Sequence, residues 1–423
     1  MKNVLFVILM LPNVLFAQTD SFIVDALVFP KKQERTITVG GISSDIQGYT
    51  NEAIQIAVDA LPSEGGSVKL SPGKFIIKAP VRLKSNVKLV GSGPETILRR
   101  IDGYHSKFII DADFGELKLT VEDASGFNAG MSIQVTDAPN SSCWNVSTGV
   151  ITDIIDNVIY IDTHLIRDYD CEKNGMVTNA GSCISVLNAQ NVLISDLQID
   201  GNKEKNDLLD GCNGGGIAIL KSKYVTVDKV LVKDFNGEGI TWQITENVTV
   251  RNCEISGCTN MGLHPGTGSP NSMIEGNNSH NNKVGMFICW RVHHSIVKNN
   301  QFHNNRDYGL STGHKDTDVL FKNNHIYENG SDGVYFRNED QKNSPHRNSF
   351  INNVVENNGT RNGGYGFNFN GNSTDVLIDD NIIRDNKNGT QKAAIFISKN
   401  SPSPREINNK MSGHKLGNIV NEK

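Results

Sequence analysis

The chain lacks the features that mark membrane-spanning and nucleic-acid-binding proteins. Beyond its first residues it has no apolar run that approaches the roughly 18 residues needed to cross a bilayer. It has no excess of basic residues, since 41 Lys and Arg stand against 46 Asp and Glu, for a net charge of −5. We therefore expect neither a membrane span nor a nucleic-acid partner. A hydrophobic content of 37% also excludes a disordered chain.

Glycine and asparagine, in contrast, are abundant. The 423 residues include 40 Gly and 50 Asn. Both residue types are poor in helices and in regular strands, but both adopt left-handed backbone conformations and tight turns readily. The composition therefore predicts a fold with many turns.

The first residues have the pattern of an export signal. Lys2 is followed by an almost wholly apolar stretch from Val4 to Phe16, and Ala17 suits cleavage. We expect a signal peptide over residues 1–17, a single domain over 18–423, and a secreted or periplasmic protein. Seven cysteines in an exported chain permit disulfides, but an odd number leaves at least one thiol over, and the sequence does not reveal the pairing.

A repeat dominates the second half of the chain. A glycine followed by an apolar residue recurs at spacings of 23, 23, 23, 24 and 24 residues. These marker glycines are Gly216, Gly239, Gly262, Gly285, Gly309 and Gly333. A second short β-like run lies between successive markers, so each repeat holds two or three short strands and no helix. Such a repeat cannot bury its apolar face alone, so the copies must stack.

The repeat length selects the architecture. A β-propeller needs repeats of about 40 residues, and a leucine-rich horseshoe needs a leucine pattern that is absent. We predict an all-β fold, a right-handed parallel β-helix. Four residues before successive markers lie Cys258, Asn281, Asn305 and Asn329, which predicts an asparagine ladder inside one turn.

Three further segments complete the predicted domain. Residues 51–61 have helical spacing, with Thr50 as N-cap, and would cover the open end of the first coil. Residues from about 115 to 170 break the period and predict a small antiparallel β insertion folded out of the solenoid. Residues from about 400 to 423 are polar and predict a partly disordered tail.

The order of these segments resembles that of a known superfamily. The predicted helix, then GGSVKLSPGKFIIKAPVRLKSNVKLVGSG, then asparagine-rich coils, is similar to the pectate-lyase-like β-helix superfamily over nearly the whole mature chain. That superfamily includes polysaccharide lyases, glycoside hydrolases, uronate epimerases and phage tail proteins, so the resemblance implies a fold rather than one reaction. Gly313-His314-Lys315 only faintly echoes the Gly-His-Gly motif of polygalacturonase-like hydrolases, whose full set of paired acids is missing. Leu263-His264-Pro265 departs at the acid from the Asp-Pro-His motif of alginate epimerases.

Strand alternation predicts which side chains share the outer face. The first and third residues after each marker are mostly apolar and should point inward, and the second and fourth should point outward. Stacking then collects cationic and aromatic side chains from four adjacent coils: His264, Trp290, Arg291, His314, Lys315, Tyr335, Arg337 and Glu339. On an acidic protein this grouping indicates an anion-binding groove. Its predicted substrate-binding residues are Arg291, Trp290, Tyr335, His294 and Arg347.

An extended anionic ligand built of rings is a uronic-acid-containing or sulfated polysaccharide. A lyase that cleaves a uronate by β-elimination removes the C5 proton and stabilises the charge that develops on the carboxylate. Lys315 or His314 is the predicted base, Arg337 or Arg291 (or a Ca²⁺) neutralises the carboxylate, and His264 or Tyr335 protonates the leaving oxygen. We expect Lys315, His314, Arg337 and His264 to be catalytic.

Three alternatives remain open at this stage. A glycoside hydrolase needs two carboxylates about 5 to 9.5 Å apart, for which Glu339, Asp340, Asp316 and Asp318 are available. A uronate C5-epimerase shares the proton abstraction with the lyase. A non-catalytic glycan-binding solenoid needs no chemistry. Glu339 and Asp340 are also predicted ligands of a Ca²⁺ ion, without any EF-hand-like spacing.

Overall fold

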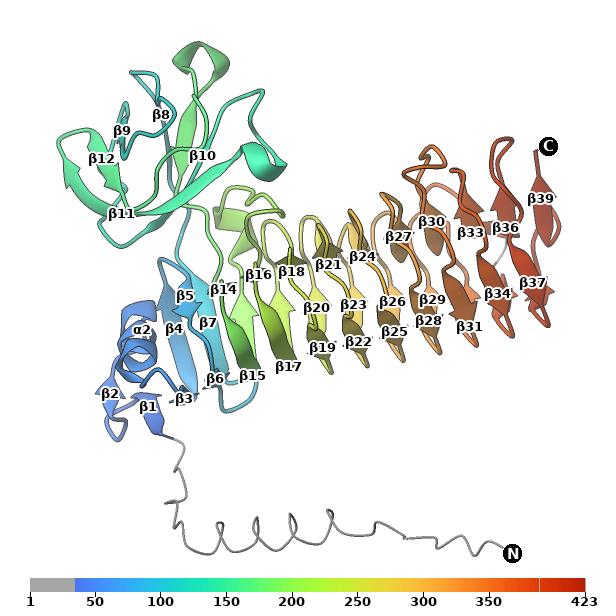
Figure 1. The fold of residues 1–423 in the computed structure, drawn as a ribbon, viewed down its shortest axis with the longest axis horizontal. Coiled ribbons are helices and arrows are strands. Elements are labelled where there is room, and N and C mark those ends of the chain that lie inside the picture. Colours follow the sequence, from blue (N-terminus) through green and yellow to red (C-terminus); the bar gives the residue numbers. More distant parts are fainter. Residues whose placement is uncertain (1–34, 388, 423) are drawn as a thin grey trace, which may run out of the picture. The chain divides into compact units, whose positions relative to one another are not determined.

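Parallel strands stack coil upon coil in a right-handed β-helix (Figure 1). The structure, a computed structural model, describes residues 35–387 and 389–422, so the predicted signal peptide lies outside the described residues. Each coil contributes one strand to an 11-stranded parallel sheet, called sheet B. Its strands are β5 (Val81–Leu83), β14 (Ile184–Leu187), β16 (Ile217–Leu220), β18 (Ile240–Gln243), β21 (Met261–Gly266), β24 (Val284–Phe287), β27 (Leu310–Thr312), β30 (Val334–Phe336), β33 (Gly364–Phe369), β36 (Gln391–Ile397) and β39 (Ile419–Asn421).

The rest of the wall is a 22-stranded sheet, called sheet A. Each coil adds to it either two short strands or one long strand, and the long strand β17 pairs with both β19 and β20 of the next coil. Its strands are β1 (Thr36–Gly40), β2 (Ile46–Gln47), β3 (Gly66–Leu70), β4 (Gly73–Ile77), β6 (Val87–Val90), β7 (Thr96–Arg100), β15 (Gln190–Asp200), β17 (Lys223–Lys233), β19 (Thr249–Arg251), β20 (Glu254–Ser256), β22 (Met273–Glu275), β23 (Asn278–His280), β25 (Ile296–Lys298), β26 (Gln301–His303), β28 (Leu320–Lys322), β29 (His325–Tyr327), β31 (Ser349–Ile351), β32 (Val354–Glu356), β34 (Leu377–Asp379), β35 (Ile382–Arg384), β37 (Arg405–Ile407) and β38 (Lys410–Ser412).

The marker glycines stack in line, as predicted. The residues that follow them pair in register, Ile217 with Ile240 and Ile240 with Leu263. A Cβ added to Gly285 would lie 2.6 Å from the carbonyl oxygen of Gly309. Neighbouring coils therefore approach too closely at this column for a side chain, which explains why glycine recurs.

Two buried asparagine ladders hold the turns together, where the sequence predicted one. In the predicted ladder the amide N of Asn305 and its Nδ2 both donate to Asn329 Oδ1, at 3.1 and 2.9 Å. Asn282, not Asn281, donates to Asn305 in the preceding coil, because the shorter repeat brings residue 282 into the buried position and leaves Asn281 outside at φ 56°. The second ladder runs through Asn277, Asn300, Asn324, Asn353, Asn381 and Asn409.

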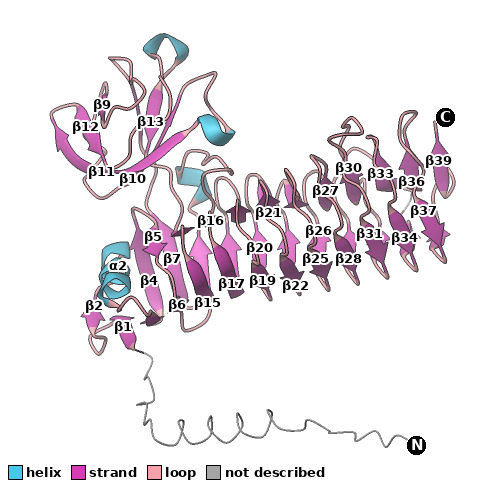
Figure 2. Ribbon diagram, viewed as in Figure 1, coloured by secondary structure: helices cyan, strands magenta, loops and turns pink. Residues whose placement is uncertain are grey.

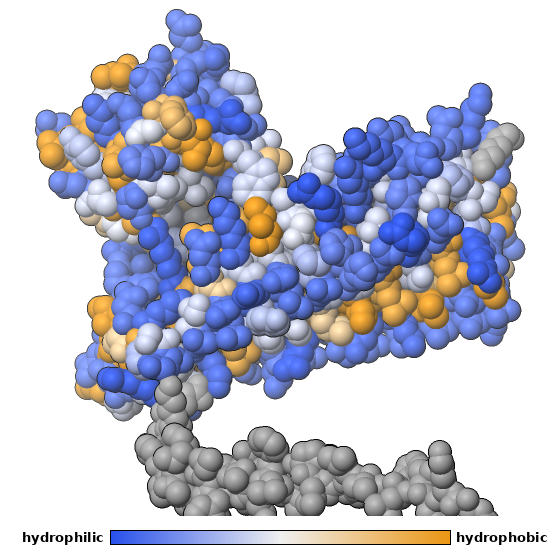
Figure 3. Space-filling model, viewed as in Figure 1, coloured by the Kyte–Doolittle hydropathy of each residue, from blue (hydrophilic) through white to orange (hydrophobic). Residues whose placement is uncertain are grey.

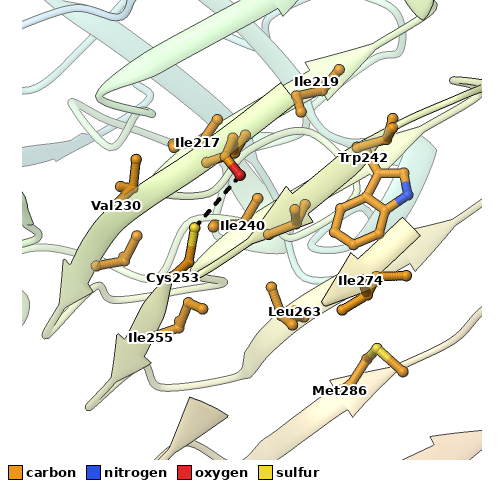
Figure 4. Close-up of a cluster of buried hydrophobic side chains, with 14 of the residues drawn as sticks. Ile217, Ile219, Val230, Ile240, Trp242, Cys253, Ile255, Leu263, Ile274 and Met286 are labelled. Atoms are coloured by element: carbon orange, nitrogen blue, oxygen red, sulfur yellow. Dashed lines mark hydrogen bonds between the residues drawn. The ribbon is translucent and has the colours of Figure 1, made fainter. Parts of the chain in front are cut away.

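The core consists of inward-facing columns of apolar side chains (Figure 4). Ile217, Ile240 and Leu263 occupy one such column on successive coils of sheet B. Trp242 is fully buried, and its indole Nε1 donates to Ser272 Oγ at 3.0 Å, which satisfies the one polar atom of that side chain. The predicted inward positions are therefore confirmed.

The ends and the insertion follow from local sequence. Helix α2 (Asn51–Ala60) begins after Thr50, whose hydroxyl accepts from the amide of Ala53 at 3.3 Å, and it packs its buried side chains against the first coil. The predicted polar tail, in contrast, forms β37, β38 and β39, because Asn409 continues an asparagine ladder by accepting from the amide of Asn381. Among the described residues, no helix is both long and apolar enough to traverse a bilayer.

The insertion, called the β excursion, is a six-stranded antiparallel sheet with its own buried cluster (Figure 2). It is wider than the predicted 115–170, because strands on both sides of that range pair to close it. Its strands are β8 (His105–Lys107), β9 (Lys118–Thr120), β10 (Ser132–Thr136), β11 (Ser147–Ile155), β12 (Val158–Ile161) and β13 (Met176–Thr178). Hydrophilic residues cover most of the visible surface of the stacked coils (Figure 3).

Candidate functional site

The outer face of sheet B carries the side chains predicted to form the groove. His264, Ser311 and Tyr335 follow their markers by two residues and share this face, since Thr241 pairs with His264 and Ser311 pairs with Tyr335 in register. The face is not open throughout. The loop over residues 201–216 covers its first coils, where Thr241 Oγ1 donates to the carbonyl of Gly211 at 3.0 Å and Thr241 is 1% exposed.

His314 lies between a thiol and a carboxylate. Its Nδ1 is 3.2 Å from Cys289 Sγ, and its Nε2 is 2.7 Å from Glu339 Oε1. Burial and the nearby Arg337 charge lower the pKa of His314, and burial raises the pKa of the Cys289 thiol. The favoured arrangement is a neutral imidazole whose Nε2–H donates to Glu339 and whose Nδ1 accepts from the thiol.

Two stacked turns carry the exposed cations. Trp290, Arg291, His314 and Lys315 all have positive φ, between 53° and 66°, so two consecutive left-handed residues shape the turn after β24 and the turn after β27. The amide of Arg291 donates to the carbonyl of His314 at 2.9 Å, which holds the two turns together. The Trp290 indole stacks on the His314 ring with 4.8 Å between centroids and 20° between planes, and Trp290 is 45% exposed. Arg291 is exposed and Lys315 is half-buried beside this stack.

Arg337 lies flat on the face, although the sequence predicted an outward residue that neutralises the substrate carboxylate. Its side chain is only 12% exposed. Nη1 donates to Ser311 Oγ at 2.9 Å, Nη2 donates to the carbonyl of Ile288 at 2.6 Å, and the guanidinium lies 4.2 Å above the Phe287 ring. Of its donors, Nε is buried without a hydrogen-bond partner. Because both Nη atoms already donate to protein acceptors, Arg337 is poorly placed to bind a ligand carboxylate with both of them.

Asp316 is the buried acid of the site. It is fully buried, its Oδ2 accepts from the amide of Gly313 at 3.0 Å, and Arg337 Nη2 is 3.4 Å away. Burial raises the pKa of Asp316 to about 7, and the Arg337 charge opposes that shift. The sequence offered Asp316 as one of the carboxylates available to a hydrolase, and its bond to Gly313 shows that it shapes the turn.

His264 is paired and covered. Its Nδ1 lies 2.8 Å from Glu238 Oε2, and both side chains are nearly inaccessible. The alignment is not that of a hydrogen bond, since His264 Nδ1, His264 Nε2 and Glu238 Oε2 all lack one. His264 is therefore buried, although the sequence predicted a catalytic role for this residue.

Tyr335 keeps access to the face. Its ring stacks on Tyr308 with 4.4 Å between centroids, and burial raises the pKa of both phenols. Asp332 is close to both rings, and burial raises the pKa of its carboxyl to about 6 although Asn368 and the amide of Tyr365 donate to it. Tyr335 is therefore a protonated, half-buried hydroxyl at the centre of the face.

His294 and Arg347 belong to a different turn. Arg347 forms a two-pronged ion pair with Asp318, at 2.8 and 2.7 Å, and His294 lies beside the same carboxylate. Nδ1 of His294 is also 2.7 Å from Nδ1 of His293. The structure thus gives these two predicted substrate-binding residues partners of their own, away from the Trp290–His314 stack.

The predicted metal ligands do not converge. Glu339 contacts His314, while Asp340 Oδ1 accepts from the amide of Asn343 at 2.8 Å and starts the next turn. Within the described part of the chain, no group of three or more His, Cys, Asp or Glu side chains is arranged to hold a metal ion.

Sequence reasoning gave no role on this face to Glu238, Cys289 or Asp332. Glu238 and Asp332 each immediately precede a marker glycine, and that position was not assigned to either side of the strand. Glu238 lies against His264, and Asp332 lies near Tyr335, so the residue before the marker glycine faces outward. Cys289 was placed outward by alternation, but only the turn geometry brings it to His314.

Comparisons with known proteins agree with this architecture. A family model described as "Rhamnogalacturonase A/epimerase, pectate lyase-like" matches residues 35–264, more than half of the chain, and one described as "Right handed beta helix region" matches residues 215–361. No curated protein matches the chain.

Solved structures with the same fold have different activities. Polygalacturonase from Erwinia carotovora ssp. carotovora has a TM-score of 0.56 at 17% identity, covering 94% of this chain and 99% of that one. The Streptococcus pneumoniae surface protein and adhesin PfbA has a TM-score of 0.56 at 14% identity, covering 92% and 100%. The A-module of Azotobacter vinelandii mannuronan C-5 epimerase AlgE4 has a TM-score of 0.50 at 16% identity, covering 87% and 92%. At these identities the likeness shows the fold alone.

Proposed function

Because the chain belongs to the rhamnogalacturonase A/epimerase, pectate lyase-like family, we propose that it acts on an anionic polysaccharide bound along the outer face of sheet B. The observation that carries this proposal is the Trp290–His314 stack with Arg291 and Lys315 beside it. A half-exposed indole offers a flat apolar surface to a sugar ring, and two adjacent cations favour a ring that carries a carboxylate.

We propose β-elimination at a uronic acid as the reaction. Arg291 is the exposed guanidinium of the site and binds the uronate carboxylate with two parallel hydrogen bonds, which stabilises the charge that develops as the C5 proton leaves. Lys315, on the stacked turn, takes that proton. Arg291 replaces Arg337 in this role because the Arg337 guanidinium is held by Ser311 and Ile288.

The remaining groups orient and complete the reaction. Glu339 and Cys289 occupy the two nitrogens of His314, so the ring is locked in place as the surface on which Trp290 stacks. Tyr335, a protonated phenol on the same face, is the proposed acid for the leaving oxygen. His264 is a positioning residue in this proposal, because it is buried against Glu238.

The carboxylates of the face favour elimination over hydrolysis. Hydrolysis needs two carboxyl groups on either side of the scissile bond. Here Asp316 is fully buried, Glu339 contacts His314, and Asp340 accepts from its own turn. Glu339 and Asp340 point to different partners and do not form a Ca²⁺ site together, so no step of this proposal uses a metal ion.

We also propose that the protein works outside the cytoplasm. The apolar stretch from Val4 to Phe16 behind Lys2 supports export, and a polymeric substrate requires an enzyme that meets it outside the cell membrane.

The test is a screen of uronate polysaccharides with three readouts on each. A lyase produces an unsaturated product with ultraviolet absorbance, and we expect that signal with the wild type and its loss with Lys315→Ala. New reducing ends without absorbance would indicate a hydrolase, and altered uronate stereochemistry by NMR would indicate an epimerase. Binding without any product would indicate a glycan-binding solenoid and would refute the enzymatic proposal.

A further inference from the structure

Cys143 and Cys212 meet where the β excursion touches the solenoid. Cys143 begins the short helix η1 (Cys143–Asn145), at the edge of the β excursion, and Cys212 lies in the loop over residues 201–216. Both thiols are free, and the Cys143 side chain lies near enough to Cys212 to influence it. They are separated by about seventy residues in sequence, so only the tertiary structure brings them together.

One carboxylate and one amide fix the two cysteines beside each other. Asp210 Oδ1 accepts from the amide of Cys143 at 2.8 Å, and Asp210 Oδ2 accepts from the amide of Cys212 at 3.1 Å. Asn213 Nδ2 donates to the carbonyl of Cys143 at 2.6 Å and to Asp210 Oδ2 at 2.9 Å. The same carboxylate therefore holds both cysteine backbones, which keeps the two residues close together in space.

We propose that Cys143 and Cys212 are a disulfide-forming pair that fastens the β excursion to the loop over residues 201–216. This inference does not rest on the proposed enzymatic function. The Asp210 carboxylate, which accepts from both cysteine amides, and the Asn213 amide, which donates to Cys143, carry it.

The other five cysteines are placed differently. Cys183, Cys253 and Cys258 are buried in the solenoid core, where Cys253 Sγ donates to the carbonyl of Arg251. Cys289 contacts His314, and Cys171 sits elsewhere in the β excursion, where its amide donates to Asp111. The pair therefore leaves five thiols unpaired, in agreement with the odd number of cysteines.

The disulfide would fix a segment that covers part of sheet B. Gln134 of β10 already bridges the two parts, because its Nε2 donates to the carbonyl of Leu208 and its Oε1 accepts from the amide of Asp210. The loop in turn covers Thr241 and lies against Glu238 at Gly211. A covalent link would convert these hydrogen-bonded contacts into a permanent cover over the first coils of this face.

A small disulfide such as oxidised glutathione can oxidise the two thiols. The exposed Cys143 thiol, as its thiolate, attacks oxidised glutathione, forms a mixed disulfide and releases one reduced glutathione. The Cys212 thiol then gives up its proton, attacks the Cys143 sulfur and releases the second glutathione. Two thiols are oxidised and one disulfide is reduced to two thiols. Burial raises the pKa of Cys212, so the second step should be the slow one.

The experiment counts and maps thiols in the full-length protein. After incubation of the folded protein with oxidised glutathione, we expect the number of titratable thiols in denaturant to fall from seven to five. Peptide mapping by mass spectrometry should recover one cross-linked peptide, joining Cys143 to Cys212. A count that stays at seven, or a cross-link from Cys143 to Cys289, would overturn the proposal.

Matched variants separate the pair from general oxidation. Cys171→Ser keeps both members of the pair, and its count should fall from six to four. Cys143→Ser should form no intramolecular cross-link at Cys212. In the oxidised wild type, hydrogen exchange of residues 137–146 should slow by about tenfold, and dithiothreitol should reverse the change. Exchange that is equal in the two redox states would show that the link holds nothing in place, against the proposal.

Discussion

The Arg337 side chain lies directly over Gly313 of the preceding coil. A Cβ added to Gly313 would lie 2.6 Å from Arg337 Nε and 2.9 Å from Arg337 Cβ. The absence of a side chain at residue 313 therefore leaves room for the guanidinium to lie along the face and contact Ser311, Ile288 and Asp316. Arg337, which the sequence predicted to contact the ligand, is therefore a largely buried part of the face.

We expect Gly313→Ala to destabilise the protein by about 1 to 3 kcal/mol, because the new methyl group forces Arg337 off its partners. Urea unfolding followed by circular dichroism measures the change. Gly41→Ala is the matched control, since its nearest contact is the Tyr49 hydroxyl at 3.3 Å. Equal losses in the two variants would contradict the steric explanation.

The asparagine ladder makes a second prediction. Asn305→Ala removes the acceptor of the Asn282 amide and the donor to the Ser279 carbonyl, and both groups are buried. We expect a loss of about 3 kcal/mol in the free energy of unfolding. Asn281→Gly, at the neighbouring position outside the ladder, keeps the left-handed turn and should change stability far less. A similar loss from both variants would show that the ladder contacts of Asn305 do not account for its effect on stability.

Substitutions of Lys315 and Arg291 should change different kinetic parameters on a confirmed substrate. If Lys315 removes the C5 proton, Lys315→Ala lowers kcat by about 10² to 10⁴ with little change in KM. Arg291→Lys should also lower kcat/KM, because an ammonium group lacks the two-pronged geometry. Lys298→Ala is the control, since Lys298 pairs with Glu275 on sheet A. Near-normal turnover of Lys315→Ala would remove Lys315 as the base.

Salt should weaken substrate binding although the protein is acidic overall. The exposed Arg291 and the half-buried Lys315 attract an anionic glycan through charges that salt screens over about 10 Å at 0.1 M. Titration calorimetry with an oligouronate at low and high ionic strength measures this dependence. An affinity that is flat across that range would mean that the two cations do not contact the ligand.

Asp316 should make stability depend on pH. Its carboxyl has a pKa of about 7 in the folded protein against 3.8 as its ordinary value, so the unfolded chain releases this proton first as pH rises. The stabilising contribution of Asp316 is therefore complete below about pH 4 and is lost as the pH rises to about 7. Relative to Asp316→Asn, the wild type should lose about 2 to 4 kcal/mol over this window. A constant difference between the two proteins across the window would show that Asp316 ionises freely in the folded state.

The amino-acid sequence by itself determined the solenoid and its register. The 23- and 24-residue spacings of the marker glycines are a property of the chain alone, and stacking of equal repeats follows from the need to bury each apolar face. Strand alternation then separated Ile240 and Trp242, which are buried, from Thr241 on the outer face. The helix over residues 51–61 and its Thr50 cap were readable for the same reason, since capping and helical spacing are local.

Only the tertiary structure decided which outward side chains remain accessible. His264 faces outward, yet it is buried against Glu238, and Arg337 faces outward, yet it lies over Gly313. The same holds for Asn282, which replaces Asn281 in the ladder, and for Cys143, which shares the Asp210 carboxylate with Cys212 although the two are far apart in the sequence. Periodicity fixes the direction in which a side chain leaves its strand. Whether another segment then covers it depends on how loops and insertions pack, and that packing involves residues far apart in the sequence.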